Sequence, residues 1–173
     1  MAGSLIKIDE EIVSSAVASV TLTGIDSTYD VYMVTVNAAS PSSGVDEIRI
    51  RVTKDVAGTP TPQTTANYDW ADKFLRASAA FINDYNTNQT STRGTGNIDN
   101  ALNGGNGIFY LYNFNNSSEY SFITIESVTY GFSEGRGYQG GTVYTVAEAH
   151  NGVYFFPSTG NIDSGTFTLY KVV

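Results

Sequence analysis

Apolar and polar residues alternate with a period of two along much of this chain, and this pattern predicts β-strands. The clearest alternation covers residues 46–53, where Ile48, Ile50 and Val52 are separated by charged and polar residues. Such alternation is typical of a strand with one face on a core and the other in water. We therefore expect these three side chains to be buried.

The same pattern predicts strands before and after this segment. Residues 13–22 and 29–37 form two apolar segments, and residues 41–44 have the Pro-Ser-Ser-Gly composition of a hairpin-like loop leading into residues 46–53. Five further strands are expected at residues 107–114, 119–130, 138–147, 153–156 and 166–173. In these strands, the alternation predicts that Phe122, Val128, Phe167 and Leu169 are buried.

Three segments have a different character. Residues 58–66 contain Pro60 and Pro62, which indicate an extended linker rather than a central strand. Residues 86–106 are rich in Asn, Thr and Gly and predict a long polar loop. Residues 135–141 contain four glycines and indicate a flexible hairpin loop.

Residues 68–85 fit two interpretations. Apolar residues fall near helical spacing, with Asp69 as an N-cap, at Trp70, Phe74, Ala77, Phe81 and Tyr85. The segment also alternates as a strand, with Leu75, Ala77, Ala79 and Phe81 on one face.

The composition favours strands and turns, because twelve Tyr, nine Phe and seventeen Gly accompany many Thr, Ser and Asn. A chain of 173 residues is expected to form one domain with its own core. We predict an all-β fold: a two-sheet antiparallel β-sandwich of jelly-roll type with about eight or nine strands. Residues 13–173 form the sandwich, and residues 1–12 are an N-terminal arm or a first strand.

Charge and cysteine content exclude several functions. The net charge is −8, and basic residues cluster only at Arg49 and Arg51, so nucleic acid is not an expected partner. No segment has the roughly 20 apolar residues of a membrane span, and residues 1–7 lack signal-peptide features, so no membrane role is expected. The absence of cysteine excludes disulfides, thiol catalysis and zinc–thiolate sites.

No catalytic constellation is evident. His150 is the only histidine, and Glu148 precedes it by two residues, which on a strand places both side chains on one face. No nucleophile is spaced to complete a triad with them. No signature marks a pair of carboxylates as flanking a sugar bond, among Asp69, Asp72, Glu126, Glu134 and Glu148. We expect no enzymatic activity.

Calcium is the one ion that the residues allow. Asp99, Asn100 and Asn103 supply oxygen ligands in a Gly-rich segment, although their spacing differs from an EF-hand loop. We expect no cofactor and retain these residues as candidates for a structural calcium site.

Three short motifs resemble a known family. They are VTLTGIDSTYDVY at residues 20–32, GIFYLYNF at residues 107–114, and FPSTGNIDSGTFTLYKV at residues 156–172. In this order they resemble small virion structural proteins of tailed, marine or cyanophage-like bacteriophages. Phe114 departs from the Pro common in that family, and residues 171–173 depart from its usual ending. The resemblance favours the strand interpretation of residues 68–85.

The resemblance implies a non-enzymatic virion protein, assembled in the host cytoplasm, that acts by protein–protein contact. A capsid decoration or cement role is expected, with the major capsid protein as partner and a homo-oligomer, first of all a trimer. The alternatives are a receptor-binding tip of a tail fibre or spike, or a carbohydrate-binding module. Candidate partner-contact residues are Leu5, Ile6 and Ile8 in the N-terminal segment, together with Arg93 and Tyr138.

Overall fold

The protein is an antiparallel β-sandwich. The computed structural model describes residues 4–100 and 104–173, and within these ranges every regular element is a strand. The described part contains no helix that is long and apolar enough to cross a bilayer. The strands are β1 (Leu5–Val13), β2 (Val20–Thr23), β3 (Val31–Pro41), β4 (Val45–Val56), β5 (Thr59–Pro62), β6 (Tyr68–Arg76), β7 (Ile82–Gln89), β8 (Thr92–Asp99), β9 (Gly105–Tyr112), β10 (Ser121–Gly131), β11 (Glu134–Tyr144), β12 (Gly152–Pro157) and β13 (Ile162–Val172).

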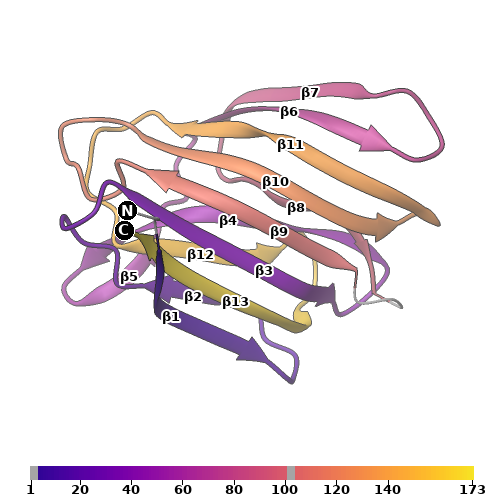
Figure 1. Cartoon of the computed structure of the whole chain (residues 1–173), viewed down its shortest axis with the longest axis horizontal. Coiled ribbons are helices and arrows are strands. Elements are labelled where there is room, and N and C mark those ends of the chain that lie inside the picture. Colours follow the sequence, from indigo (N-terminus) through magenta and orange to yellow (C-terminus); the bar gives the residue numbers. More distant parts are fainter. Residues whose placement is uncertain (1–3, 101–103) are drawn as a thin grey trace.

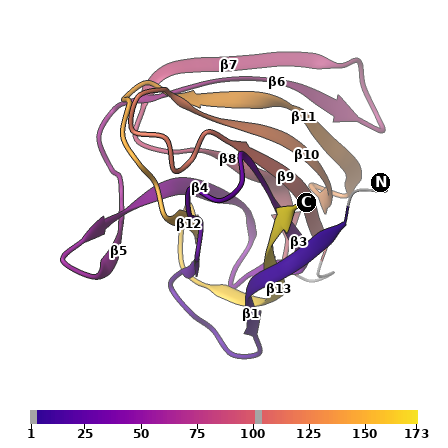
Figure 2. The same cartoon turned by 60° about the vertical axis from the view of Figure 1, so that its left-hand side comes forward.

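Two sheets form the layers of the sandwich. The large sheet has the order β1-β13-β3-β9-β10-β11-β6-β7, so β13 lies between β1 and β3 (Figure 1). The small sheet has the order β2-β12-β4-β5, and β8 also pairs with β4. In the turned view β5 projects at one side of the molecule (Figure 2). The predicted all-β sandwich is confirmed.

The core lies between the two sheets. Ile48, Ile50 and Val52 of β4 are fully buried, as predicted, and so are Phe167 and Leu169 of β13. Burying side chains of this size stabilises the fold by about 1.5–3 kcal/mol each. Aromatic contacts join the layers: the ring of Phe155 on β12 lies 5.2 Å from Phe167 and 6.0 Å from Phe109 on β9.

The prediction that Phe122 and Val128 are buried is wrong. Strand β10 alternates strictly, but Ile123 and Ile125 point into the core, so Phe122 and Val128 lie on the outer face, 43% and 60% exposed. A strand with apolar residues on both faces does not reveal its orientation, because a shift of one residue exchanges the two faces.

The predicted count of eight or nine strands is too low, because β1 and β5 are strands and because the described residues between 86 and 99, expected in a loop, belong mostly to β7 and β8. Strand β7 (Ile82–Gln89) covers the beginning of this segment. It is almost wholly exposed, and its sequence therefore lacks the apolar–polar alternation by which a strand is recognised. Strand β8 is buried but built of small residues, since its neighbours are large. A Cβ at Gly96 would lie 1.7 Å from the ring of Tyr138.

Other boundaries also differ from expectation. The single strand predicted at residues 13–22 is wrong: β1 ends at Val13, β2 begins at Val20, and Leu5–Val13 is the first strand. Residues 41–44 do not form a hairpin, because β3 and β4 belong to different sheets. Residues 135–141 lie within β11, not in a flexible loop.

The remaining segments follow the extended interpretations. Residues 68–76 are a strand, β6, and not a helix. Strand β5, with Pro60 and Pro62, pairs only with β4, as the missing proline donors require of an edge strand.

Candidate functional sites

A serine, a histidine and a glutamate meet at one end of the sandwich. Ser121 begins β10, and His150 and Glu148 lie in the segment between β11 and β12. A hydrogen bond of 2.8 Å joins Ser121 Oγ to His150 Nδ1, and His150 Nε2 lies 3.6 Å from Glu148 Oε1. Glu148 and His150 do lie close together, but in a segment outside any strand rather than on one strand face as predicted, and Ser121 joins them without any signal in the sequence.

This arrangement differs from a catalytic triad because a substrate cannot reach the serine. Ser121 and His150 are fully buried, and the Tyr144 ring covers the imidazole edge-on at 4.9 Å. Burial lowers the pKa of His150 to about 4, so the imidazole is neutral at pH 7. The group therefore fits a structural clamp between strands rather than a nucleophile that a substrate reaches.

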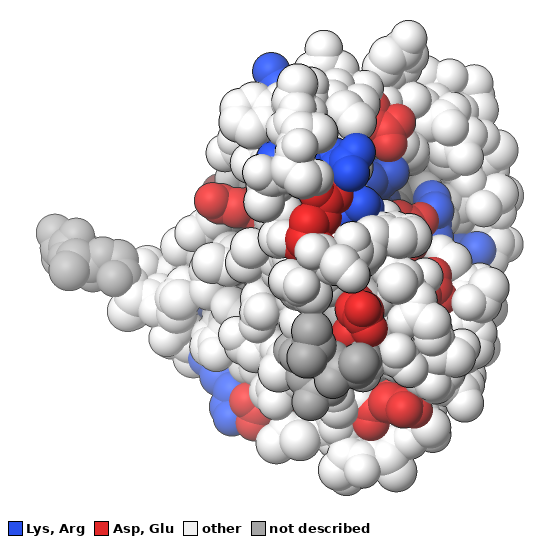
Figure 3. Space-filling view, turned by 90° about the vertical axis from the view of Figure 1, so that its right-hand side faces the viewer, with Lys and Arg blue, Asp and Glu red and all other residues white. Residues whose placement is uncertain are grey.

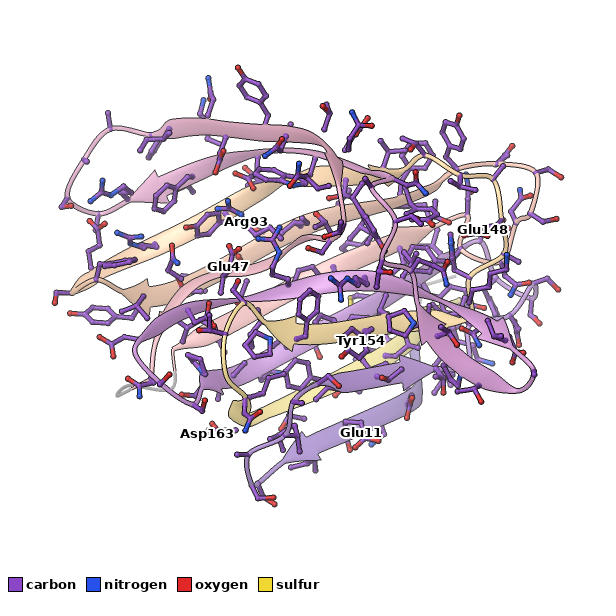
Figure 4. The ribbon with its side chains drawn as sticks, turned by 180° about the vertical axis from the view of Figure 1, so that it is seen from behind. Glu11, Glu47, Arg93, Glu148, Tyr154 and Asp163 are labelled. Carbon is purple, nitrogen blue, oxygen red and sulfur yellow. The ribbon has the colours of Figure 1, made fainter. Side chains whose placement is uncertain are left out.

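Glu148 ties this group to the small sheet. Its Oε2 lies 2.6 Å from Lys54 Nζ of β4, and its Oε1 accepts a 3.2 Å hydrogen bond from Tyr144 (Figure 4). Burial opposes ionisation of Glu148, but the hydrogen bond and charge of Lys54 outweigh it, so the pKa lies below its ordinary value. Glu148 thus links Lys54 of β4 to Tyr144 of β11, across the two layers.

A second polar group gathers at the opposite end, where basic and acidic side chains meet in a hollow (Figure 3). Arg93 of β8 pairs with three carboxylates from three strands: Asp84 at 2.9 Å, Asp72 at 3.4 Å and Glu47 at 3.8 Å. Figure 4 shows Arg93 and Glu47 side by side. One guanidinium is therefore shared by three carboxylates, of which Glu47 also pairs with Arg49.

Aromatic rings and arginines alternate through this end as a ladder. Its order is Phe132, Arg136, Phe74, Tyr138, Arg93, Trp70. The successive separations are 4.4, 5.1, 4.6, 4.7 and 5.1 Å. Such cation–π contacts contribute about 0.5–2 kcal/mol each. The ladder explains how charged residues occupy the interior at this end.

Asp72 is the least satisfied member of the group. Its side chain is almost fully buried, and neither carboxylate oxygen has a hydrogen-bond partner in the described chain. Burial raises its pKa to about 6, against the opposing charge of Arg93. Glu134, at the far end of β11, is well satisfied by comparison: hydrogen bonds from Ser78 and Arg76 lower its pKa to about 2.

The outer face of the large sheet is a third candidate. The strand register places one row of outward side chains across five strands: Thr35, Ile108, Glu126, Gln139 and Lys73. The adjacent row contains Tyr110, Thr124, Gly141, Ala71 and Tyr85. This face points toward the viewer in Figure 1 and is not covered by any described element.

Two neighbouring clefts hollow this face. The first, here the Glu126 cleft, has a volume of about 500 Å³ and is lined by Thr35, Asn37, Ile108, Glu126, Val128 and Gln139, among others. The second, the Tyr85 cleft, is equally large and more apolar, with Ala71, Tyr85, Phe122, Gly141 and Val143. Three outward positions of β11 are glycines, Gly135, Gly137 and Gly141, and they leave room between the taller side chains of β10 and β6.

The predicted partner-contact residues separate into two groups. Leu5 and Ile6 are exposed on β1, whereas Ile8 is partly buried and packs against the core. Arg93 and Tyr138 do lie together, but both are enclosed in the ladder and do not form an exposed surface.

The calcium candidates lie only partly within the described residues. Asn100 uses its backbone, which donates to Gly44 and accepts from Ser40 Oγ, and Asn103 lies outside the described residues. Among the described residues no cluster of three acidic, histidine or cysteine side chains suits a metal.

Comparison with known proteins gives no relatives: no family model matches the chain, and neither does any curated protein. Function must therefore be argued from the molecule itself. In the sequence, Gly137-x-Gln139-x-Gly141 indicates only that two small residues share one face of β11; the clefts themselves depend on the register of the neighbouring strands.

Proposed function

We propose that the protein is a non-enzymatic structural subunit of a tailed-bacteriophage particle, with a capsid decoration or cement role. It attaches to neighbouring virion proteins, the major capsid protein first among them, through strand β1. The resemblance of its three sequence motifs to small virion proteins supports the assignment to a phage particle. The edge of the large sheet supports the mode of attachment.

Strand β1 is the observation that carries this proposal. It pairs with β13 on one side only, so its other backbone edge is open to a partner strand. Leu5, Ile6 and Ile12 are exposed along it, which is unusual for three aliphatic side chains on one short strand. Glu11 is also exposed there (Figure 4), so a partner strand with aliphatic and basic residues suits this edge.

The edge is protected against indiscriminate pairing. A β-bulge between Lys7 and Asp9 interrupts the register with β13, and Asp9 Oδ2 turns inward to accept a 2.7 Å hydrogen bond from the Thr23 amide. Bulges and charges of this kind limit edge-to-edge aggregation. Attachment to a shaped partner, and a symmetric trimer as the first form to test, therefore fit this edge better than open-ended assembly.

The test uses substitutions rather than truncation, because deleting residues 1–9 removes Ile8 from the core. The triple variant Leu5→Ser, Ile6→Ser, Ile12→Ser should fold but occupy particles at least tenfold less than the wild type, measured by cryo-electron microscopy of reconstituted particles. Its matched control is Val56→Ser, Phe81→Ser, Ile82→Ser, which removes three exposed apolar side chains elsewhere. Equal occupancy by both variants would refute attachment through β1.

A further inference from the structure

The Glu126 cleft has the composition of a ligand site that the attachment role leaves unused. Its volume of about 500 Å³ falls within the range of about 300–1,000 Å³ that is usual for ligand pockets. Aliphatic side chains of Ile108 and Val128 alternate in it with the polar groups of Thr35, Glu126 and Gln139. A cleft that is apolar and polar at once suits a ligand with both kinds of surface.

The polar groups of this cleft are free to bind. The side chains of Thr35, Asn37, Glu126 and Gln139 make no hydrogen bond or ion pair within the described chain. Asn106 is positioned by its Oδ1, which accepts a 3.0 Å hydrogen bond from the Ala38 amide and leaves the Nδ2 donors available. The cleft therefore offers a carboxylate, amides and a hydroxyl within one hollow.

Charge and position narrow the class of ligand. No Lys or Arg lines the cleft, Glu126 does, and the chain carries a net charge of −8, so an anionic ligand is disfavoured. The cleft lies on the middle strands of the sheet, whose backbone groups are already paired, so a peptide cannot add as a strand. A bare cation would use neither the volume nor the aliphatic walls.

A neutral sugar ring satisfies all these conditions. Its hydroxyl groups donate to a carboxylate and exchange hydrogen bonds with amides, while its C–H faces pack on aliphatic and aromatic side chains. The Tyr85 cleft follows directly along β11, from Gln139 to Gly141, and presents Phe122 and the 75% exposed Tyr85. We infer that the two clefts form one binding site for a neutral oligosaccharide, with hydrogen bonding at Glu126 and ring stacking at Tyr85.

The inference goes beyond attachment through β1 and does not depend on it. Ligand-observed NMR and isothermal titration with the purified full chain test it, using neutral tetrasaccharides of glucose, galactose and mannose in several linkages. The comparison ligand is tetragalacturonate, which has sugar rings of the same shape with carboxylates. At least one neutral tetrasaccharide should bind with a Kd of about 1 mM or tighter, as weak single sites do, and more tightly than its monosaccharide.

Variants locate the site. Glu126→Ala should weaken binding at least tenfold, whereas Glu119→Ala, which removes an exposed carboxylate from a turn, should not. Gly137→Val should fill the cleft floor and abolish binding, and Gly135→Val, at the next outward position where the space is open, should leave it within twofold. Tyr85→Ala should remove the preference for the tetrasaccharide over the monosaccharide.

Each contrary result overturns the inference. The first is that no neutral tetrasaccharide binds at 20 mM, roughly the limit of useful affinity. The second is that tetragalacturonate binds more tightly than every neutral tetrasaccharide. The third is that the Glu126→Ala and Glu119→Ala proteins bind the neutral tetrasaccharide equally well. Thermal unfolding of every variant confirms that a lost signal reflects the site and not the fold. Particle occupancy of the β1 variants is a separate readout, so the two proposals fail independently.

Discussion

Arg93 and Asp72 face each other across the interior at 3.4 Å, yet the pair is unbalanced, because the same guanidinium also serves Asp84 and Glu47. Asp72 is the most buried of the three acids and has no hydrogen bond of its own within the described chain. A buried carboxylate with an incomplete partner destabilises a fold when it ionises. Ionisation of Asp72 at higher pH should therefore lower the free energy of unfolding, whereas protonation of His150 should lower it at acidic pH.

Asp72→Asn should stabilise the protein at pH 8 but not at pH 4. The folded-state pKa of about 6 exceeds the ordinary value of 3.8, so the carboxyl contributes stability below pH 3.8 that is lost as pH rises through 6. The gain in free energy of unfolding at pH 8, relative to pH 4, should approach roughly 3 kcal/mol. Urea unfolding at both pH values measures it, with the exposed Asp163→Asn as control. A gain that is the same at both pH values would contradict the assignment.

His150 has the opposite effect on the pH dependence of stability: it favours the folded state at higher pH. Its folded-state pKa of about 4 lies below the ordinary 6.5, so its contribution is present above pH 6.5 and is lost as pH falls through 4. In the wild type this loss, about 3 kcal/mol, nearly offsets the gain from Asp72 over the same interval.

The two effects separate in single variants. Between pH 6.5 and 4, the Asp72→Asn protein should lose stability, and the His150→Gln protein should gain it, while the wild type changes little. His150→Gln itself should lower stability at pH 7 by about 1–3 kcal/mol, because it alters a buried hydrogen bond to Ser121. Parallel pH profiles for the two variants would show that other groups dominate.

Gly96→Ala should be among the most destabilising single-methyl substitutions in the chain. The new Cβ would overlap the ring of Tyr138, which Phe74 and Arg93 hold from both sides. We expect a loss of about 2–4 kcal/mol in free energy of unfolding, as for overpacked cores. Gly135→Ala, where the nearest atom is 4.0 Å away, is the control and should change stability by less than about 0.5 kcal/mol.

A double-mutant cycle identifies the cause. If the clash with Tyr138 is responsible, Gly96→Ala should cost much less in a Tyr138→Leu background, with a coupling of at least about 1 kcal/mol. Additive effects of the two substitutions would assign the loss to the backbone of β8 instead.

The sequence was sufficient where only one face of a strand is apolar. Residues 46–53 have this asymmetry, and the burial of Ile48, Ile50 and Val52 was predicted correctly, although Thr53, expected to face solvent, is fully buried. It was insufficient where both faces carry apolar side chains, as in β10, or where a strand is almost wholly exposed and, apart from Ile82 and Tyr85, polar, as in β7. Strand β8 was missed for a third reason: its small residues are dictated by Tyr138 and Ile50, which come from other strands.

The candidate sites show the same division. The spacing of Glu148 and His150 suggested a shared strand face, but they meet in a segment outside any strand, and Ser121 joins them only through the tertiary fold. Arg93 and Tyr138 were expected to contact a partner, but their contact with each other and their enclosure between Phe74 and Trp70 depend on β6 packing beside β8. The outer clefts required the register of five strands, which no local pattern contains.

The position of β13 between β1 and β3 also determines when the molecule can be completed. During synthesis β1 emerges first and has no partner until β13, the last strand, leaves the ribosome. Until then β3 has an open edge, and the core lacks Phe167 and Leu169. The nascent chain must therefore remain unaggregated with its largest sheet unfinished, and such long-range pairing is expected to make folding slow.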